Sequence, residues 1–431
     1  MASTGLNSSV SPVEDVGVAD LVVGLPTFNH AGTIGAVVAA ARSALHDGFS
    51  GIRWRVLVVD GGSTDGTQAA AKAAFGERAE GFSVVDYRVH GEDLAAAPYH
   101  GVPARDAALR TLFDAARRSG ARAVAALDST AVGVTPAWIA RLAQPALDDA
   151  FDFVAPRYQR HAFEGVLIRG IVQPVFRACY GLRLQEPMPA DFGCSSRMLE
   201  TLSAAGTWPL EGDHAEIDLW LAATAASRGL RVCEAALGPK RRGSREDVQD
   251  LSGTIAQIVG GLFNELEGRA AIWHRVRGSV AVPLHGTVPN EPMENPTVNP
   301  GPLLESFRLG YRELVDVWAE ILPPATILEY KKLSLAPEPS FRMDDRLWAR
   351  TIYDFALGHR LRVMARDHLL RSLTPLYLGW LASFILFARN ESAEAVDARL
   401  DGLCQSFEAE KPYLISRWRW PERFRPMKNS V

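Results

Sequence analysis

WRVLVVDGGSTDGT, residues Trp54–Thr67, is the most informative stretch of this sequence. Its segment Arg55–Val59 is a short apolar run rich in β-branched residues, which predicts a strand buried on both faces of a parallel sheet. Two aspartates and three glycines follow in Asp60–Thr67, before a helical pattern begins. Ligands of open α/β sheets bind at this end of the strands, where glycines let the backbone approach a polar ligand closely. The alternative is a plain Gly-rich turn with an Asx cap at Asp65.

A second unit of the same kind precedes this one. Ala19–Leu25 is another buried-strand run, Pro26–His30 follows it, and the segment Thr33–Leu45 is helical in pattern. The order strand, PTFN, helix, strand, DGGSTDGT, helix resembles the opening of the nucleotide-sugar glycosyltransferases of GT-A fold. The resemblance implies an α/β fold, a Rossmann-like mixed sheet flanked by helices, whose first two loops hold the base and ribose of the donor. The donor-binding residues that it implies are Pro26, Thr27, Asn29, Asp60, Gly62 and Asp65.

Composition narrows the function classes. The 431 residues carry a net charge of −4 with a pI near 6.2, so a general nucleic-acid surface is not expected. The four cysteines lie far apart, which favours a reducing compartment, and the first residues lack the basic start and apolar core of a signal peptide. The longest apolar stretch, Leu373–Ala388, contains a proline and a glycine and predicts a buried helix rather than a membrane span. We therefore expect a cytoplasmic protein.

The chain divides into four parts by pattern. Residues 1–17 read as a flexible tail and residues 18–280 as the GT-A domain. Residues 281–302 contain six prolines and three asparagines without apolar periodicity, which predicts a linker or a long surface arm. Residues 303–431 are mostly helical in pattern and predict a helical C-terminal region.

Further segments narrow the resemblance to the retaining GT-A enzymes that make glucosylglycerate, mannosylglycerate or glucosyl-3-phosphoglycerate. It implies transfer of a hexose from UDP-glucose or GDP-mannose to a small acidic acceptor such as glycerate or phosphoglycerate, with retention. In such a reaction the acceptor hydroxyl attacks on the face from which the diphosphate leaves, and no enzyme nucleophile is needed. The segments that carry the resemblance are Pro156–His161, Gln173–Gly181, Glu186–Ser195, Trp208–Trp220 and Leu237–Lys240.

The metal site of that group is altered in this sequence. The resemblance implies a divalent cation, Mg²⁺ or Mn²⁺, held by Asp128, because hard cations prefer carboxylate oxygens. Thr130 stands in place of the second carboxylate, and Arg242 stands in place of a histidine ligand. Our hypothesis is that Arg242 replaces the metal in stabilising the departing diphosphate, with Lys240 beside it in the donor site. A solvated basic loop is the alternative.

The remaining candidates also follow from the resemblance. Arg105 keeps a donor-binding cation, and Asp191 would accept hydrogen bonds from the sugar; the alternative is that Asp191 only caps the helix that begins near Ser195. Asp213 and Asp218 are candidates for acid or base catalysis; the alternative is that their helix only presents one packed face. The residues expected at the acceptor are Arg160 and Arg169.

The sequence therefore predicts a hexosyltransferase. The rival hypothesis is a catalytically silent relative that binds a nucleotide sugar and acts through partners, because the metal motif is incomplete. A Rossmann dehydrogenase ranks third, since DGGSTDG lacks the glycine spacing for pyrophosphate. We expect no nucleic-acid partner and no membrane span. A homodimer is a hypothesis that rests on the apolar residues Leu376, Tyr377, Trp380, Phe384 and Phe387.

Overall fold

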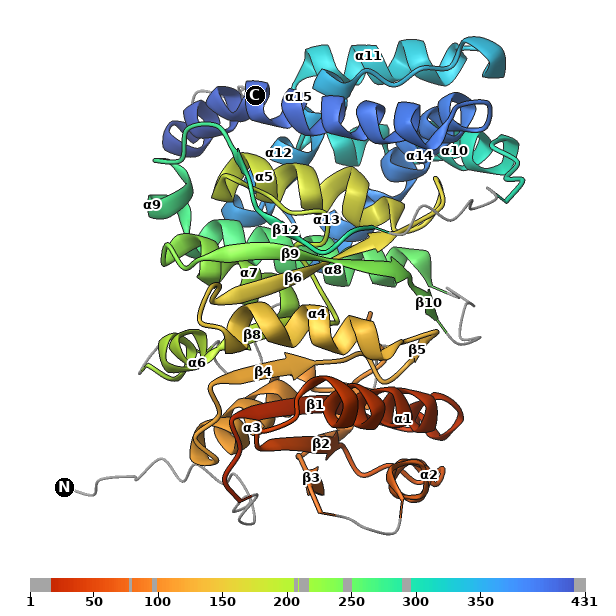
Figure 1. Cartoon of the computed structure of the whole chain (residues 1–431). Coiled ribbons are helices and arrows are strands. Elements are labelled where there is room, and N and C mark those ends of the chain that lie inside the picture. The colour runs from red at the N-terminus through yellow and green to blue at the C-terminus, as the bar shows by residue number, and fades with distance from the viewer. Residues whose placement is uncertain are drawn as a thin grey trace, which may run out of the picture.

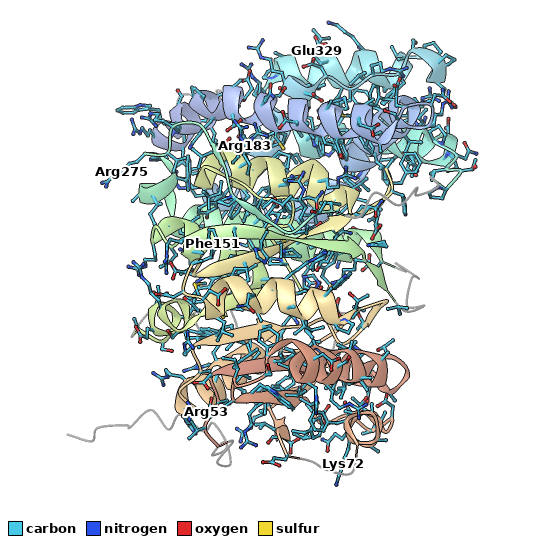
Figure 2. All side chains as sticks on the ribbon, viewed as in Figure 1. Arg53, Lys72, Phe151, Arg183, Arg275 and Glu329 are labelled. Atoms are coloured by element: carbon cyan, nitrogen blue, oxygen red, sulfur yellow. The ribbon has the colours of Figure 1, made fainter. Side chains whose placement is uncertain are left out.

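The computed structural model describes residues 17–76, 80–94, 99–204, 208, 217–242, 250–288 and 296–421. Figure 1 shows the chain from its first strands at the bottom to its C-terminal helices at the top. In Figure 2 the side chains fill the spaces between these layers.

The strands are short, and most belong to one sheet. They are β1 (Leu21–Thr27), β2 (Trp54–Asp60), β3 (Phe82–Asp86), β4 (Ala123–Ala126), β5 (Ala131–Val132), β6 (Phe153–Gln159), β7 (Leu182–Arg183), β8 (Phe192–Ser195), β9 (Val232–Pro239), β10 (Arg241–Arg242), β11 (Val280–Ala281) and β12 (Leu284–His285).

The helices of the N-terminal two thirds lie between these strands in the sequence. They are α1 (Ala31–Gly48), α2 (Thr67–Phe75), the 3₁₀ turn η1 (Gly91–Leu94), α3 (Arg105–Arg118), α4 (Pro136–Leu147), the π-helical turn η2 (Ile168–Val172), α5 (Gln173–Tyr180), α6 (Ser196–Ser203), α7 (Ile217–Ser227), α8 (Leu251–Gly268) and α9 (Ala270–Trp273).

The C-terminal region is helical, as its apolar pattern predicts. It contains α10 (Gly301–Ala319), α11 (Pro324–Leu335), the 3₁₀ turn η3 (Glu338–Ser340), α12 (Asp345–Leu361), α13 (Arg366–Ser372), α14 (Thr374–Ala388) and α15 (Ala393–Arg419).

The main sheet is mixed. Among the described residues it has eight strands in the order β12-β9-β6-β8-β4-β1-β2-β3. Strand β8 runs antiparallel to both of its neighbours, β4 and β6, while the other neighbouring pairs are parallel. This is the Rossmann-like mixed sheet flanked by helices that the sequence predicts for a GT-A fold.

Helices cover both faces of the sheet. Since successive residues of a strand point to opposite sides, each strand packs against helices on both faces. In β1, Leu21, Val23 and Leu25 pack with α1, α2 and α4 in one apolar cluster. Val22 of the same strand and Leu57 of β2 pack on the other side, with α3 and the helices beyond it. The prediction that these strands are buried on both faces is confirmed.

Segment 281–302 is partly integrated into the fold. In its described part, β12 pairs with β9 in the main sheet, and Ala281 continues β11, which pairs with β7. The described residues between these strands and α10 have no regular structure until Gly301. The boundary positions between the four predicted parts stay a prediction.

The apolar stretch in the C-terminal region is the buried helix α14. Residues Arg366–Ala388 are long and apolar enough to cross a membrane by composition, but 72% of their most apolar window is buried inside the chain. Leu376, Tyr377, Trp380 and Phe384 are all at most 2% exposed. These four side chains therefore lie in the core of the chain and do not form an exposed surface, while Phe387 is half-buried. The homodimer itself stays a prediction.

Candidate active site

Three parallel strands bring the two predicted loops and the segment Asp128–Thr130 to one edge of the sheet. Strand β1 lies between β2 and β4, and Thr27 at its end is in register with Asp60 at the end of β2. Leu127 and Asp128 follow β4 directly, and the amide of Leu127 donates to the carbonyl of Gly24 at 2.9 Å. The strand ends predicted from the sequence are thus neighbours in space.

The loops after β1 and β2 are joined by hydrogen bonds. Asn29 has a left-handed backbone with φ of 55°, which asparagine tolerates better than most residues. Its side-chain oxygen accepts a hydrogen bond from the backbone amide of Thr64 at 2.9 Å. The backbone amide of Asn29 donates to Ser63 Oγ at 2.8 Å. Asn29 therefore shapes the site through the second loop.

Asp60 is fully buried at the base of this loop. Its carboxylate accepts from the amide of Ser63 at 3.0 Å and from Gln68 Nε2 at 2.6 Å. Gln68 lies in the first turns of α2 and also reaches the carboxylate of Asp86 at 3.3 Å. Sequence reasoning missed Gln68, because a glutamine inside an alanine-rich helix carries no motif.

Asp65 and Gly62 have different surroundings within the same loop. Asp65 accepts from the amides of Ala31 and Thr67, each at 3.0 Å, and so ties the starts of α1 and α2 together. Burial alone would raise the pKa of Asp65, but these hydrogen bonds and that from the Thr67 hydroxyl lower it. This is the capping geometry of the structural alternative. Gly62 has a φ of 87°, and no described atom lies within 4 Å of the place a Cβ would take, so a ligand has room there.

His30 connects the first loop to the segment that follows β4. The ring is buried, and its Nδ1 lies 3.2 Å from both Thr27 Oγ1 and Ser129 Oγ. Ser129 in turn donates to the carbonyl of Pro26. Pro26 and Thr27, both predicted donor residues, are therefore held against the segment that carries Asp128. The sequence did not reveal this structural role, because a single histidine such as His30 forms no recognisable motif.

The centre of the site is a buried network of two carboxylates and one ammonium. Lys240 Nζ lies 2.7 Å from Asp191 Oδ2 and 2.9 Å from Asp128 Oδ2. Asp191 also accepts from the amide of Asp128 at 2.7 Å and from the hydroxyl of Tyr158. Burial and the neighbouring Asp191 raise the pKa of Tyr158 well above its usual value, so the phenol stays a donor. Ser195, not Asp191, caps α6, which removes the capping alternative for Asp191.

A second buried ion pair lies beside this network. Arg105 Nε is 2.8 Å from Asp218 Oδ2, and Arg105 Nη2 donates to the carbonyl of Ala190 at 2.9 Å. His100 Nε2 lies 3.3 Å from the same oxygen of Asp218. Burial raises the pKa of Asp218, although Arg105 opposes the rise. Burial would lower the pKa of Arg105, but Asp218 and the more distant Asp128 and Asp191 raise it, so the guanidinium stays charged.

For two predicted catalytic residues, Asp213 and Arg242, the structure gives little or no information. Asp213 lies outside the described residues. For Arg242 the backbone is described: it belongs to β10, which pairs with β5 so that Arg242 faces Ala131 and Arg241 faces Val132. The register brings the backbone at Arg242 next to the segment Asp128–Thr130.

The two arginines predicted at the acceptor are both ion-paired. Arg160 reaches Glu186 at 2.8 Å and Glu164 at 3.1 Å. Arg169, in the π-helical turn η2, is 2.9 Å from Asp397 of α15. Burial lowers the pKa of Arg169, and Asp397 opposes this shift. The charges of both side chains are therefore compensated within the protein.

The residues present do not fit a divalent cation at Asp128. Among the described residues, no group of three or more His, Cys, Asp or Glu side chains is placed to hold a metal ion. Thr130 donates its hydroxyl and its amide to Asp128 Oδ1, at 2.6 and 2.9 Å, so it acts as a donor toward the carboxylate. The other oxygen of Asp128 faces Lys240.

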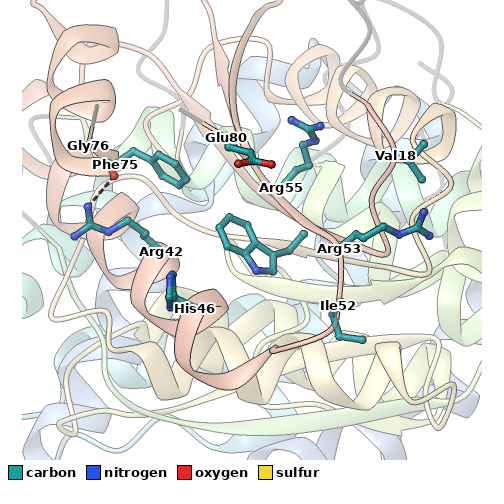
Figure 3. A pocket seen from close by; sticks show the side chains of 11 residues that line it. Val18, Arg42, His46, Ile52, Arg53, Arg55, Phe75, Gly76 and Glu80 are labelled. Carbon is teal, nitrogen blue, oxygen red and sulfur yellow. Dashed lines mark hydrogen bonds between the residues drawn. The ribbon is translucent and has the colours of Figure 1, made fainter. Parts of the chain in front are cut away.

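A separate pocket of about 830 Å³ lies far from these residues. Figure 3 shows several of its lining residues, with Arg42 donating to the carbonyl of Phe75 at 2.7 Å. Trp54 lines this pocket at the start of β2, whereas Asp60 ends the strand, about 20 Å away at 3.3 Å per residue. The pocket is not part of the candidate site.

Comparison with known families agrees with this geometry. Residues 22–194 match the sequence profile of the family described as glycosyl transferase family 2. Over these residues the chain is similar to glycosyltransferase family 2. The match runs from β1 to β8 and so includes Asp60, Asp128 and Asp191. No curated protein sequence matches the chain.

Several solved structures are similar to part of this chain. Glucosyl-3-phosphoglycerate synthase from Mycobacterium tuberculosis, in complex with Mn²⁺, UDP and glucosyl-3-phosphoglycerate, is 22% identical, with a TM-score of 0.44 over 59% of this chain and 81% of that one. The same enzyme in complex with Mg²⁺ and UDP is 22% identical, with a TM-score of 0.44 over 59% of this chain and 80% of that one. A mycobacterial protein is 25% identical, with a TM-score of 0.42 over 59% of this chain and 76% of that one.

Proposed function

We propose that this chain transfers a hexose from a nucleoside diphosphate sugar, UDP-glucose or GDP-mannose, to a small acidic acceptor such as glycerate or phosphoglycerate, with retention. The observation that carries the proposal is the meeting of Asp60, Asp128 and Asp191 at one edge of the sheet, within the part of the chain that is similar to glycosyltransferase family 2. The motif resemblance that names the donors and the acceptors runs through the same residues.

On this proposal the base and ribose of the donor bind over the two joined loops. Asp60 is buried and held by Ser63 and Gln68, which fixes the direction of its carboxylate toward a ribose or base donor group. The open space at Gly62 lets the nucleotide approach the backbone. Asp191, held by Tyr158, Lys240 and the Asp128 amide, accepts from a sugar hydroxyl with its remaining capacity.

Retention needs no enzyme nucleophile. The acceptor hydroxyl attacks the anomeric carbon from the face that the diphosphate leaves, the bond from that carbon to the phosphate oxygen breaks, and the departing phosphate oxygen takes the proton. The protein contributes position and charge. Arg160 and Arg169 would hold the acidic acceptor only if it replaced one of the carboxylates now paired with them, Glu164, Glu186 or Asp397.

The test is donor binding and transfer in Asp60→Asn, with Asp86→Asn as its matched control. Asp86 faces Asp60 in the β2–β3 register and shares Gln68 with it, but it is exposed at the sheet edge. Because a hydrogen bond to a charged group contributes about 1.5–3 kcal/mol, we expect Asp60→Asn to weaken UDP or GDP binding about 10- to 100-fold and Asp86→Asn to bind normally. Calorimetric titration gives both affinities, and product analysis with glycerate or phosphoglycerate gives the transfer. Equal affinities in the two variants would contradict the assignment of Asp60.

A catalytically silent relative is the second candidate. The observation that favours it is that Lys240 and Arg105, two cations expected at the donor, are both already paired with protein carboxylates. It predicts nucleotide binding without release of free UDP or GDP for any acidic acceptor. Turnover with one acceptor would exclude it.

A further inference from the structure

Lys240 occupies the place between two carboxylates at the centre of the site. It follows β9 directly, whereas Asp128 follows β4 and Asp191 precedes β8, so three separate elements bring the groups together. All three side chains are nearly inaccessible, with Lys240 5% exposed, Asp128 2% and Asp191 0%. The ammonium contacts both carboxylates within 3 Å.

The two carboxylates are satisfied by donors of the protein. Asp191 accepts from the Asp128 amide and the Tyr158 hydroxyl in addition to Lys240. Asp128 accepts from the amide and hydroxyl of Thr130 on its other oxygen. Two close buried carboxylates repel each other unless a cation lies between them. The Lys240 ammonium already lies between the two carboxylates and offsets their repulsion. A divalent cation would therefore first have to displace a buried lysine.

The two positions where the resemblance implies further metal ligands carry other residues in this sequence. Position 130 carries a hydroxyl that donates to Asp128, and position 242, which is opposite Ala131 in the β10–β5 pair, carries an arginine. Arginine binds phosphate oxygens in a bidentate manner and cannot coordinate a metal as a cation. The register therefore brings the backbone of two arginines, Arg241 and Arg242, beside the segment Asp128–Thr130.

We propose that this chain binds its nucleoside diphosphate donor without a divalent cation, with Lys240 serving as a fixed counterion of Asp128 and Asp191. The inference rests on the proposed function and refines its donor site. The inference keeps the hypothesis from sequence that Arg242 stabilises the leaving diphosphate, and it gives Lys240 a separate, positioning role.

The first experiment measures UDP and GDP binding to the full chain by calorimetric titration, in EDTA and in Mn²⁺. We expect the affinity for the preferred nucleotide to agree within about twofold in the two buffers. Binding at least tenfold tighter in Mn²⁺ would overturn the inference and leave the proposed function standing. Absence of binding of both UDP and GDP in either buffer would overturn the proposed function and the inference together.

The second experiment uses Mn²⁺ alone as the probe and compares the wild type with Lys240→Met. Removing the ammonium leaves two adjacent carboxylates without their counterion, and Mn²⁺ can then replace it. We expect the Tm of Lys240→Met to rise by at least about 2 °C when Mn²⁺ replaces EDTA, and that of the wild type to stay unchanged. A purely structural lysine would lower the Tm without creating a response to Mn²⁺, and that result would contradict the counterion role.

The matched control adds Asp191→Asn to Lys240→Met, which removes one of the two carboxylates and should abolish the Mn²⁺ response. Should Lys240→Met fail to fold in either buffer, the wild-type titration decides. A wild-type Tm that rises with Mn²⁺ in the absence of nucleotide would show a metal site despite Lys240 and would overturn the inference.

Discussion

Single side chains at the sheet edge are satisfied by partners that are distant in the sequence. Lys240 lies between Asp128 and Asp191, and Arg105 pairs with Asp218 across 113 positions. A buried charge without such a partner is costly, so each of these groups depends on the others being in place. For this reason a single substitution in the network changes both the site and the stability of the protein.

His359, by contrast, is a buried titratable group outside the site, and it predicts an acid-sensitive contribution to stability. Burial lowers its pKa to about 4, with Arg366 and Arg362 adding to the shift and Glu267 opposing it. In the unfolded chain a histidine takes up a proton below about pH 6.5, whereas folded His359 stays neutral down to about pH 4. The unfolded state therefore binds more protons in this window, and stability falls as the pH falls through it.

We expect urea unfolding to report this difference between pH 7.5 and pH 5.0. The wild type should lose about 1 kcal/mol more free energy of unfolding on acidification than His359→Gln, allowing for solvent screening. The neighbouring Glu267, Arg362 and Arg366 are common to both proteins and serve as the internal control. Equal losses in the two proteins would exclude His359 as the source.

At the scale of elements, the π-helical turn η2 and helix α14 fit together closely. A Cβ on Gly170 would stand 2.2 Å from the ring of Trp380, and the carbonyl of Gly170 accepts from Trp348 Nε1 at 2.9 Å. Trp380 is itself stacked between Trp348 and Phe384, with ring centroids 5.7 and 5.6 Å apart. The ring is buried and packs against both neighbours, so an added Cβ forces this packing to shift.

Gly170→Ala should therefore destabilise the protein by about 1–3 kcal/mol through overpacking. Gly402→Ala is the matched control, since that glycine lies inside α15 and no described atom stands within 4 Å of its Cβ position. The control should stabilise the protein by about 0.5–1 kcal/mol, because alanine favours helix over glycine. Urea unfolding measures both changes, and a neutral Gly170→Ala would show that the ring can shift.

At the scale of the whole molecule, the N-terminal sheet region and the C-terminal helices share one apolar core. The cluster that contains Leu57 of β2 also contains Trp348 and Trp380 of the C-terminal region. Helix α15 is joined to α5 by Arg177, which pairs with Asp401 and with Glu408. Lys411 of α15 donates to the carbonyls of Ala178 and Val276 at 2.7 and 2.9 Å.

A shared core predicts that the whole chain unfolds in one cooperative transition. Differential scanning calorimetry should give a single peak whose calorimetric and van't Hoff enthalpies agree. Arg177→Met should move this peak to lower temperature by removing the hydrogen bonds to Asp401 and Glu408, at a cost of about 1–3 kcal/mol, and should keep it single. Two separate peaks, in the wild type or in the variant, would show that the helical region unfolds on its own.

The sequence by itself determined the sheet and the place of the site. Near-continuous apolar runs in Leu21–Thr27 and Trp54–Asp60 predict strands covered on both faces, and parallel strands place their carboxyl ends at one edge of the sheet, which brings Asp60 and Asp128 to the same edge. These features depend on local pattern and on the geometry common to all such sheets. Only the tertiary structure decided which charges pair: Lys240 with Asp128 and Asp191, and Arg169 with Asp397 rather than with an open pocket. The physical reason is that such contacts depend on the packing of elements far apart in the chain, and the pattern of residues along one element does not contain that information.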